Sequence, residues 1–132
     1  MRIGAPFAHR APYDVRMSSG TRPAGARDAQ ERGDRLEVAA SVLALLADRT
    51  RLALMERLGR GEADVTTLTE ACGAARPSVS QHLAKLRLAG LVTTRRDGRR
   101  VVYSVRHGHL RRLVDEAMNV ADHEISSLPP HD

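Results

Sequence analysis

The sequence predicts a mainly α-helical domain that carries one β-hairpin. Apolar residues recur at helical spacing through most of the chain after residue 34, and two β-branched runs flank Asp97-Gly98. The composition is aliphatic, with 42% hydrophobic residues but only 2% aromatic ones. At 132 residues the chain is long enough for one small domain, whose modest core would gain from being shared across a dimer.

Composition divides the chain into three parts. Residues 1–33 mix Pro, Gly, Ser, Ala and Arg without apolar periodicity, which predicts a disordered basic arm. Residues 34–125 contain the periodic segments and form the expected folded domain. Residues 126–132 form a tail that is broken by Pro129-Pro130.

Three helices are expected in the first half of the domain. The first begins near Arg35 and is apolar almost all round, as expected of an element that is buried by its own domain and by a partner subunit. Asp48 is the expected N-cap of a second helix, which stops at Gly59. After a turn at 61–63, a short third helix spans residues 65–72.

A fourth helix completes a helix-turn-helix. It carries Pro77 in its first turn, where a missing N–H costs nothing, and it ends before Gly90. Val79, Leu83 and Leu86 form its apolar stripe, and polar residues lie around that stripe: Arg76, Ser78, Ser80, Gln81, Lys85 and Arg87. A short helix, a tight turn and a polar-faced second helix are the parts of a helix-turn-helix.

A hairpin and a last helix follow. The β-branched runs on either side of Asp97-Gly98 predict a β-hairpin, and four arginines at its tip make it a basic wing. The last helix is expected from about residue 107 to residue 125. The complete prediction is a winged helix-turn-helix with four helices, two strands and a fifth helix, in that order.

The charge of the chain favours a polyanionic partner. The net charge is +5 and Lys85 is the only lysine, so nearly all the cations are arginines, which suit bidentate contacts to phosphate and guanine. An arginine bias inherited from a GC-rich genome would give the same composition. A recognition helix presents short polar side chains and guanidinium groups from its first turns. The candidate DNA-binding residues are Arg76, Ser78, Ser80, Gln81, Lys85, Arg95, Arg96, Arg99 and Arg100.

Each of these residues taken singly is equally well explained as a solvated surface position. Their combination in this order favours DNA binding. His82 lies near the apolar stripe, so we expect it to pack or to bond to the backbone rather than to read bases.

Four segments carry a family resemblance. They are Leu45-Leu46-Ala47-Asp48-Arg49-Thr50-Arg51-Leu52, Pro77-Ser78-Val79-Ser80-Gln81-His82-Leu83-Ala84-Lys85-Leu86, Ala89-Gly90-Leu91-Val92 and Arg96-Asp97-Gly98-Arg99. Over roughly residues 35–125 the chain resembles the ArsR/SmtB family of bacterial repressors. The resemblance implies a homodimer paired through its first and last helices, which binds double-stranded operator DNA and is released by a ligand. By position, Arg76, Ser80 and Gln81 match the family's base-contacting residues.

The resemblance also bears on the ligand. Family members that sense soft metals or arsenic carry a Cys-x-Cys pair on the third helix, because thiolates select such ions. The matching positions here are Asp64 and Thr66, which excludes soft-metal sensing through that site. Cys72, the single cysteine, is expected to be a small core residue rather than a redox switch.

Histidines on the last helix suggest a different metal site. His109 and His123 are fourteen residues apart, about 21 Å along a helix, so one chain cannot bring both to one ion. They do share a sector, because fourteen steps end about 40° from the start. An antiparallel pair of last helices would place His109 of one subunit near His123 of the partner subunit, which gives two symmetric sites.

This arrangement resembles the last-helix metal site of the family. His107 and His109 match its first two ligands and His123 matches its last, but Val120 occupies the remaining position and cannot bind metal. The candidate ligands are therefore His107, His109, Asp122, His123 and His131, a pattern that resembles the nickel- and cobalt-sensing mycobacterial branch. Nitrogen and oxygen ligands suit Ni(II) or Co(II), with Zn(II) as a further candidate.

Two features leave alternatives to this metal site. Exposed histidines near a helix start and a tail can equally be incidental solvated residues. Asp122 would join the site only if the helix unwinds near its end, because it points away from the sector of His109 and His123.

The alternative function is a repressor of the same family that responds to a non-metal signal or to none. A metal-handling protein that does not act on DNA is less favoured.

Other classes of protein are excluded or disfavoured. The sequence has no Gly-rich phosphate loop, no nucleophile elbow and no His-Glu-x-x-His motif, so no enzyme is predicted. One cysteine excludes an intrachain disulfide, and no apolar run is long enough for a signal peptide or a membrane span. We therefore expect a soluble cytoplasmic protein with no membrane partner.

Overall fold

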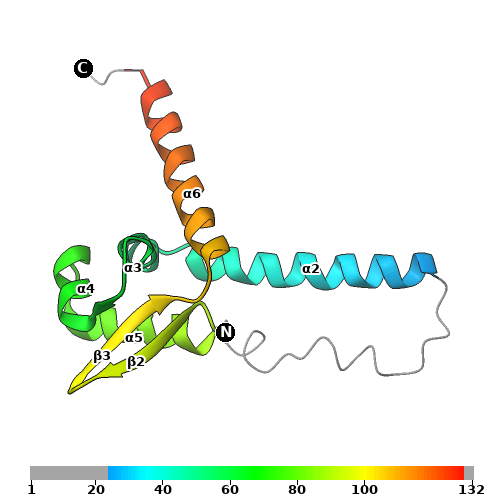
Figure 1. Ribbon diagram of the computed structural model, residues 1–132. Helices are drawn as coiled ribbons and strands as arrows, with labels where there is room; N and C mark the ends of the chain where they lie inside the picture. The colour runs from blue at the N-terminus through cyan, green and yellow to red at the C-terminus, as the bar shows by residue number, and fades with distance from the viewer. Residues whose placement is uncertain (1–23, 130–132) are drawn as a thin grey trace.

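The computed structural model describes residues 24–129, which form five helices and a small sheet (Figure 1). The helices are α2 (Ala24–Leu46), α3 (Arg49–Gly59), α4 (Val65–Cys72), α5 (Arg76–Leu88) and α6 (Gly108–Ser127). The strands are β1 (Ala63–Asp64), β2 (Val92–Asp97) and β3 (Arg100–Val105). The predicted mainly helical fold with a β-hairpin wing is confirmed, and each predicted helix and strand is present.

Aliphatic side chains from all of the helices and from the sheet form one core. The core lies around α3, which contacts α2, α4, α5, α6 and β3. The most deeply buried side chains are Leu45, Leu54, Met55, Leu68, Val79, Leu83, Leu86, Val92 and Val114. Because the recognition-helix stripe of Val79, Leu83 and Leu86 belongs to this core, the opposite face of α5 is directed to solvent.

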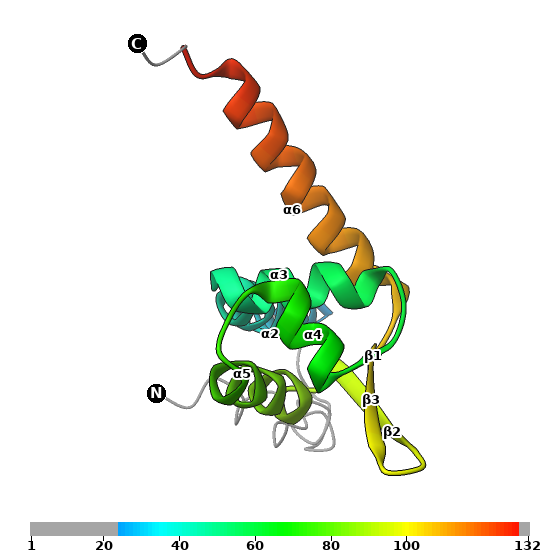
Figure 2. The same ribbon diagram turned by 90° about the vertical axis from the view of Figure 1, so that its left-hand side faces the viewer.

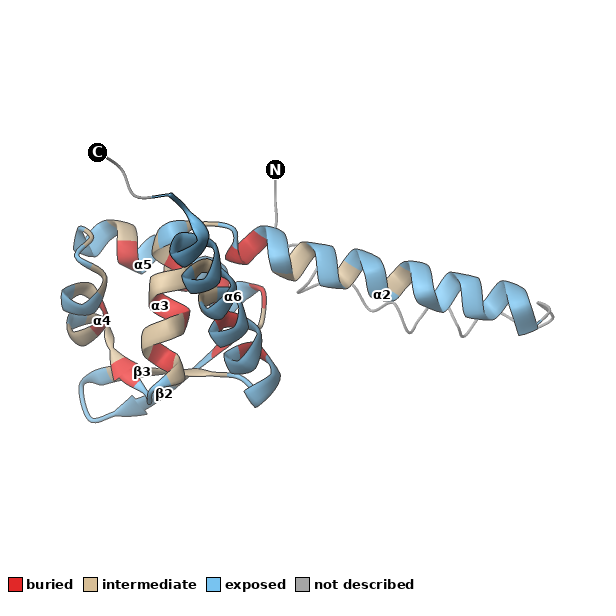
Figure 3. Cartoon of the chain, turned by 90° about the horizontal axis from the view of Figure 1, so that it is seen from above, coloured by how far each residue is buried: buried red, intermediate tan, exposed pale blue. Residues whose placement is uncertain are grey.

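The first helix begins earlier than the sequence analysis expected. α2 starts at Ala24, so the interpretation of 24–33 as part of a disordered arm is wrong. These residues are mostly Ala, Arg, Gln and Glu, which favour a helix even without an apolar face. The exposed amino-terminal part of α2 extends away from the other elements (Figures 1 and 3). Residues 1–23 of the predicted arm, including His9, lie outside the described part of the chain.

Local capping explains where the next helices begin and end. The Asp48 carboxylate accepts a hydrogen bond from the backbone N–H of Arg51 at 2.9 Å, which confirms the predicted N-cap of α3. Asp64 caps α4 in the same way through the N–H of Thr67 at 2.9 Å. α4 ends at Gly73, whose φ of +63° is left-handed backbone that favours glycine.

The sheet has one strand more than the sequence analysis expected. β1 pairs with β3, so the three antiparallel strands lie in the order β1-β3-β2, and Ala63 belongs to β1 rather than to a turn. At the hairpin, Asp97 pairs with Arg100. The two turn residues are therefore Gly98 and Arg99, one position later than Asp97-Gly98, with Gly98 at φ +64°.

α2 and α6 leave large apolar side chains uncovered. α6 rises away from the other elements, as Figure 2 shows, and it ends at Ser127, two residues beyond the expected end. The exposed apolar residues on these helices are Leu36, Leu43, Leu113, Val120 and Ile125. No helix within residues 24–129 combines the length and the apolar character needed to cross a membrane.

Candidate DNA-binding surface and metal-ligand residues

α5 presents most of its predicted DNA-binding residues to solvent. Pro77 lies in the first turn and Ala75 is the extended N-cap residue, so the helix starts at the predicted place. Four of the five candidates on this helix are exposed, and Ser78 is half-buried. The exposed candidates are Arg76, Ser80, Gln81 and Lys85.

The first residue of α5 also contacts the other helix of the helix-turn-helix. A guanidinium nitrogen of Arg76 donates to the hydroxyl of Thr66 on α4 at 3.2 Å. This bond is exposed, so Arg76 can exchange it for another acceptor at little cost.

Arg51, which was not among the predicted functional residues, belongs to a polar cluster between α3 and α5. Arg51 is buried, and its Nε donates to the backbone carbonyl of Leu45 at the end of α2. One of its terminal nitrogens donates to Nδ1 of His82 at 3.0 Å, and Nε2 of His82 lies 3.8 Å from the Asp48 carboxylate. His82 therefore faces inward as expected, but it bonds to a side chain rather than to the backbone.

The spacing of apolar residues in α3 could have identified Arg51 as a buried residue. Arg51, Leu54, Met55 and Leu58 lie at positions i, i+3, i+4 and i+7 of α3, so Arg51 shares the buried face. An arginine on such a face needs internal acceptors, and those acceptors come from α2 and α5.

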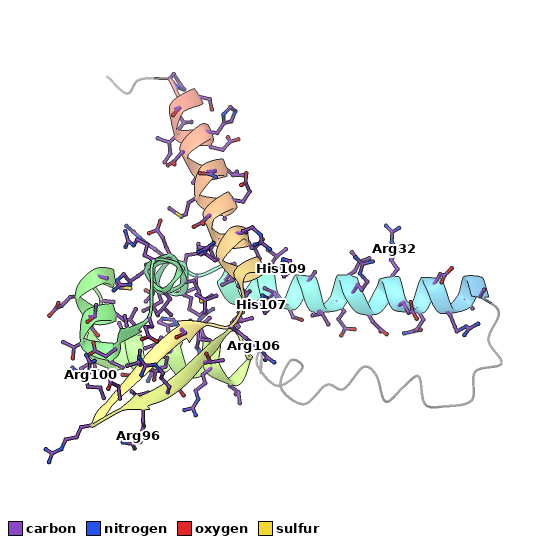
Figure 4. All side chains as sticks on the ribbon, in the orientation of Figure 1. Arg32, Arg96, Arg100, Arg106, His107 and His109 are labelled. Carbon is purple, nitrogen blue, oxygen red and sulfur yellow. The ribbon has the colours of Figure 1, made fainter. Side chains whose placement is uncertain are left out.

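The wing carries its four arginines on two faces. The Arg95 guanidinium forms a two-pronged ion pair with Glu62, with Nε 3.1 Å from Oε2. Arg100 donates to Asp64 at 3.2 Å and to Asp97 at 2.9 Å. In the described residues, the side chains of Arg96 and Arg99 make no hydrogen bond or ion pair. Figure 4 shows Arg96 directed away from the body, on the other side of the hairpin from Arg100.

These pairs lower the pKa values of the carboxylates at the base of the wing. The hydrogen bond from Arg95 holds the pKa of Glu62 below its ordinary value. The Thr67 backbone N–H contributes most to lowering the pKa of Asp64, and Arg100 adds to it. Asp64 is thus a helix cap and an ion-pair partner.

Four of the five predicted metal ligands are described, and they are exposed at the two ends of α6. His107 is the N-cap residue, and its ring centroid is 5.7 Å from that of His109 (Figure 4). Nδ1 of His109 accepts from Arg112 at 2.7 Å, so a metal ion at that nitrogen would displace Arg112. Asp122 and His123 lie near the far end of the helix, and His131 falls outside the described residues.

A single chain does not assemble these ligands. Among residues 24–129, no group of three or more His, Cys, Asp or Glu side chains is placed to hold a metal ion. α6 is regular through Ser127, so Asp122 and His123 point about 100° apart around its axis. Cys72 is half-buried against the core, and burial raises the pKa of its thiol, in keeping with a packing role.

Comparison with known proteins decides the family. Residues 48–94, which span α3 to the start of β2, match the model of the bacterial regulatory proteins of the arsR family. The chain is 43% identical over 98 residues to the HTH-type transcriptional regulator KmtR of Mycobacterium tuberculosis, which covers 74% of this chain and 75% of that protein. The chain belongs to the ArsR family. As an ArsR-family protein it is a DNA-binding transcriptional repressor and not an enzyme.

Solved structures of other transcriptional regulators share its fold. The transcriptional repressor BigR of Xylella fastidiosa is similar with a TM-score of 0.61 and 28% identity, over 72% of this chain and 94% of that one. The homodimeric winged helix-turn-helix DNA-binding domain of Mb0332 from Mycobacterium bovis is similar with a TM-score of 0.66 and 26% identity. That match covers 86% of this chain and 100% of the other.

Proposed function

We propose that the protein is a homodimeric repressor that leaves its operator when Ni(II) or Co(II) binds between the last helices of the two subunits. Zn(II) is a further candidate inducer. The main support for this proposal comes from α6. This helix is exposed over most of its length and carries His109 and His123 near its two ends. The DNA-binding half of the proposal follows from the family, and the inducer half follows from α6.

The DNA-binding surface consists of α5 and the wing. The exposed residues of the first turns of α5 are suited to base edges in the major groove, with Arg76 and Gln81 as the base readers. The wing arginines are suited to phosphates, which add affinity without sequence information. A symmetric dimer would present two such surfaces to an inverted repeat.

Exposed apolar residues on α2 and α6 support the dimer. Leu36, Leu43 and Val120 are each more than half exposed, which is costly for a single chain in water. A groove between α3 and α6 adds Leu52, Ala53 and Met118, beside the charged Asp48, Arg49 and Glu56. Pairing of α2 and α6 with a second copy would bury these side chains.

The same pairing would complete the metal site. Antiparallel α6 helices place His109 of one subunit beside the partner subunit's His123, with His107 next to His109. Two or three imidazoles with a carboxylate from Asp122 form a donor set that suits Ni(II) or Co(II). Asp122 could join only through a local change in the helix, and His131 through the tail.

Coupling between the two sites follows from differential binding. A bound ion would supply coordination bonds that exist in one arrangement of the dimer only. His109 and the partner's His123 would then fix the angle between the α6 helices, and the two α5 helices would no longer match the half-site spacing. Linkage requires that operator DNA weaken metal binding by the same factor.

Operator binding measured with each metal tests this function. A duplex selected from random DNA by the full-length protein would be titrated by fluorescence anisotropy, with Ni(II), Co(II) or Zn(II) added in turn. A typical coupling lowers operator affinity about five- to 150-fold on saturation.

Variants on α6 test whether the metal acts through its histidines. His109→Ala and His123→Ala should each remove most of the metal response and keep operator binding. Asn119→Ala, an exposed substitution on the same helix, should keep both. If the two histidine variants still release DNA as the parent does, α6 is not the inducer site. If no metal changes affinity in any variant, the repressor responds to another signal or to none.

A further inference from the structure

The four arginines of the wing are not equivalent. Arg95 and Arg100 are each held by carboxylates of the same chain, whereas Arg96 and Arg99 have no side-chain partner within residues 24–129. The partners of Arg95 and Arg100 include Glu62 and Asp64, which belong to the segment between α3 and α4 rather than to the hairpin.

The strand register explains the division. Arg95 pairs with Val102, and Val102 pairs with Asp64 of β1, so Arg95 and Asp64 lie on one face of the sheet. Asp97 and Arg100 pair directly and lie on the same face, while Arg96 alternates to the other face. In Figure 4, Arg100 lies on the side of the hairpin towards α4, and Arg96 points away from it.

The face of the sheet that carries Arg95, Asp97 and Arg100 has no net positive charge. Arg57, Arg95 and Arg100 line its cavity together with Glu62, Asp64 and Asp97, which makes three cations against three anions. Arg57 also donates to the backbone carbonyl of Gly61 at 3.0 Å. A guanidinium that moves from a carboxylate to a phosphate gives up an existing ion pair, so it gains less from the phosphate than an unpaired guanidinium does.

We propose that Arg96 and Arg99 make the phosphate contacts of the wing, and that Glu62 and Asp64 are positioning residues that keep Arg95 and Arg100 from the DNA. This inference rests on the DNA-binding wing of the proposed function. It reduces the wing's expected phosphate contacts from four arginines to two. It also predicts the effect of removing the Glu62 charge. Arg95 would then be able to contact the phosphates of any duplex, whatever its sequence.

The salt dependence of DNA binding tests this division without any metal. Log affinity falls linearly with log salt concentration, and the magnitude of that fall is called the salt slope. Each phosphate contact adds about 0.9 to the salt slope, which is about a threefold to fourfold loss of affinity between about 50 and about 200 mM salt. Arg96→Gln should lower the slope by about one on operator and on random duplex. Glu62→Gln should raise it by about one and strengthen binding to random duplex.

Two comparisons make the test specific. Glu70→Gln removes the same charge from an exposed position on α4 that has no ion pair in the described chain, and it should not change the slope. Arg95→Gln should cancel the gain of Glu62→Gln when the two are combined. By itself, Arg95→Gln should lower the slope less than Arg96→Gln does. Thermal unfolding of each variant checks that the wing remains folded.

The result that overturns the proposal is an equal slope loss for Arg95→Gln and Arg96→Gln, or no difference between Glu62→Gln and Glu70→Gln. Either would show that Glu62 does not keep Arg95 from the DNA. Failure of the proposed function looks different, because the parent protein would then bind operator and random duplex equally or would not respond to metal.

Discussion

Arg51 is the buried charged residue of the described chain, with 8% of its surface exposed. It stays buried because two acceptors surround it: the Leu45 carbonyl of α2 and Nδ1 of His82 on α5. One side chain of α3 therefore joins the end of the proposed dimer helix to the recognition helix.

Replacing Arg51 by methionine tests this link. Arg51→Met keeps much of the length of the side chain but leaves the Leu45 carbonyl and the His82 ring without their donor. The free energy of unfolding in urea should fall by about 1–3 kcal/mol. Arg49→Met is the matched control, because Arg49 is exposed at the first residue of the same helix. Equal losses for the two variants would show that the buried bonds contribute nothing specific.

Asp48 links stability to pH. The backbone N–H of Arg51, and then the charge of Arg51, hold the pKa of Asp48 below its ordinary value. A depressed folded-state pKa gives stability that is present above the unfolded value of about 3.9 and is lost as the pH falls through the folded value.

Asp48→Asn keeps a capping oxygen and removes the charge. Its unfolding free energy should lie below that of the parent near neutral pH, and the two should converge as the pH falls below about 4. Denaturant unfolding between about pH 3 and about pH 7 measures the difference. A constant offset across this range would mean that the charge of Asp48 does not stabilise the fold. Asp115→Asn on α6 is the control for loss of a surface carboxylate.

At the scale of elements, α5 combines two faces with different tasks. Val79, Leu83 and Leu86 fix the helix in the core, and His82 adds a polar anchor beside them. Gln81 lies on the exposed side and is free to reach a base edge.

Gln81→Ala should therefore affect operator recognition rather than folding. Loss of a base-edge contact is expected to cost about 1–3 kcal/mol on the selected operator and much less on a random duplex. Anisotropy titrations of both duplexes at one salt concentration measure the two losses. An equal loss on both would assign Gln81 to the phosphate backbone, and no loss would assign it to a solvated face.

Considering the whole molecule, the projecting helices α2 and α6 carry five of the seven large apolar residues that are exposed in the described chain. Figure 3 shows both helices exposed over most of their length. α2 reaches away from the core and α6 rises above α3, so their apolar surfaces meet few neighbours within the chain. A second copy is the occupant that the proposed function requires.

Two leucines of similar exposure test the dimer. Leu43 on α2 is 54% exposed and Leu88 on α5 is 58% exposed. Leu43→Asp should convert a dimer into a monomer in sedimentation, and operator affinity should fall because one recognition helix is lost from the complex. Leu88→Asp should remain dimeric. Dimeric behaviour of both variants would remove α2 from the interface.

Features that depend on neighbouring residues could be predicted from the sequence. The helical periods, the Asp48 cap, the Gly73 end of α4 and the hairpin around Gly98 are set by interactions over a few positions, and the structure has all of them. The polar face of α5 was equally readable, because its apolar stripe defines the opposite face. The start of α2 was missed because helix propensity, rather than an apolar face, supports residues 24–33.

Contacts between polar side chains distant in the sequence depend on how the elements pack together. Arg51 and His82 are 31 positions apart, and Glu62 and Arg95 are 33 positions apart. Their pairing depends on the packing of α3 against α5 and on the register of β1 with β3, which no local pattern encodes. The wing arginines look alike in the sequence, and they differ in the structure because strand alternation turns Arg95 and Arg96 to opposite faces of the sheet.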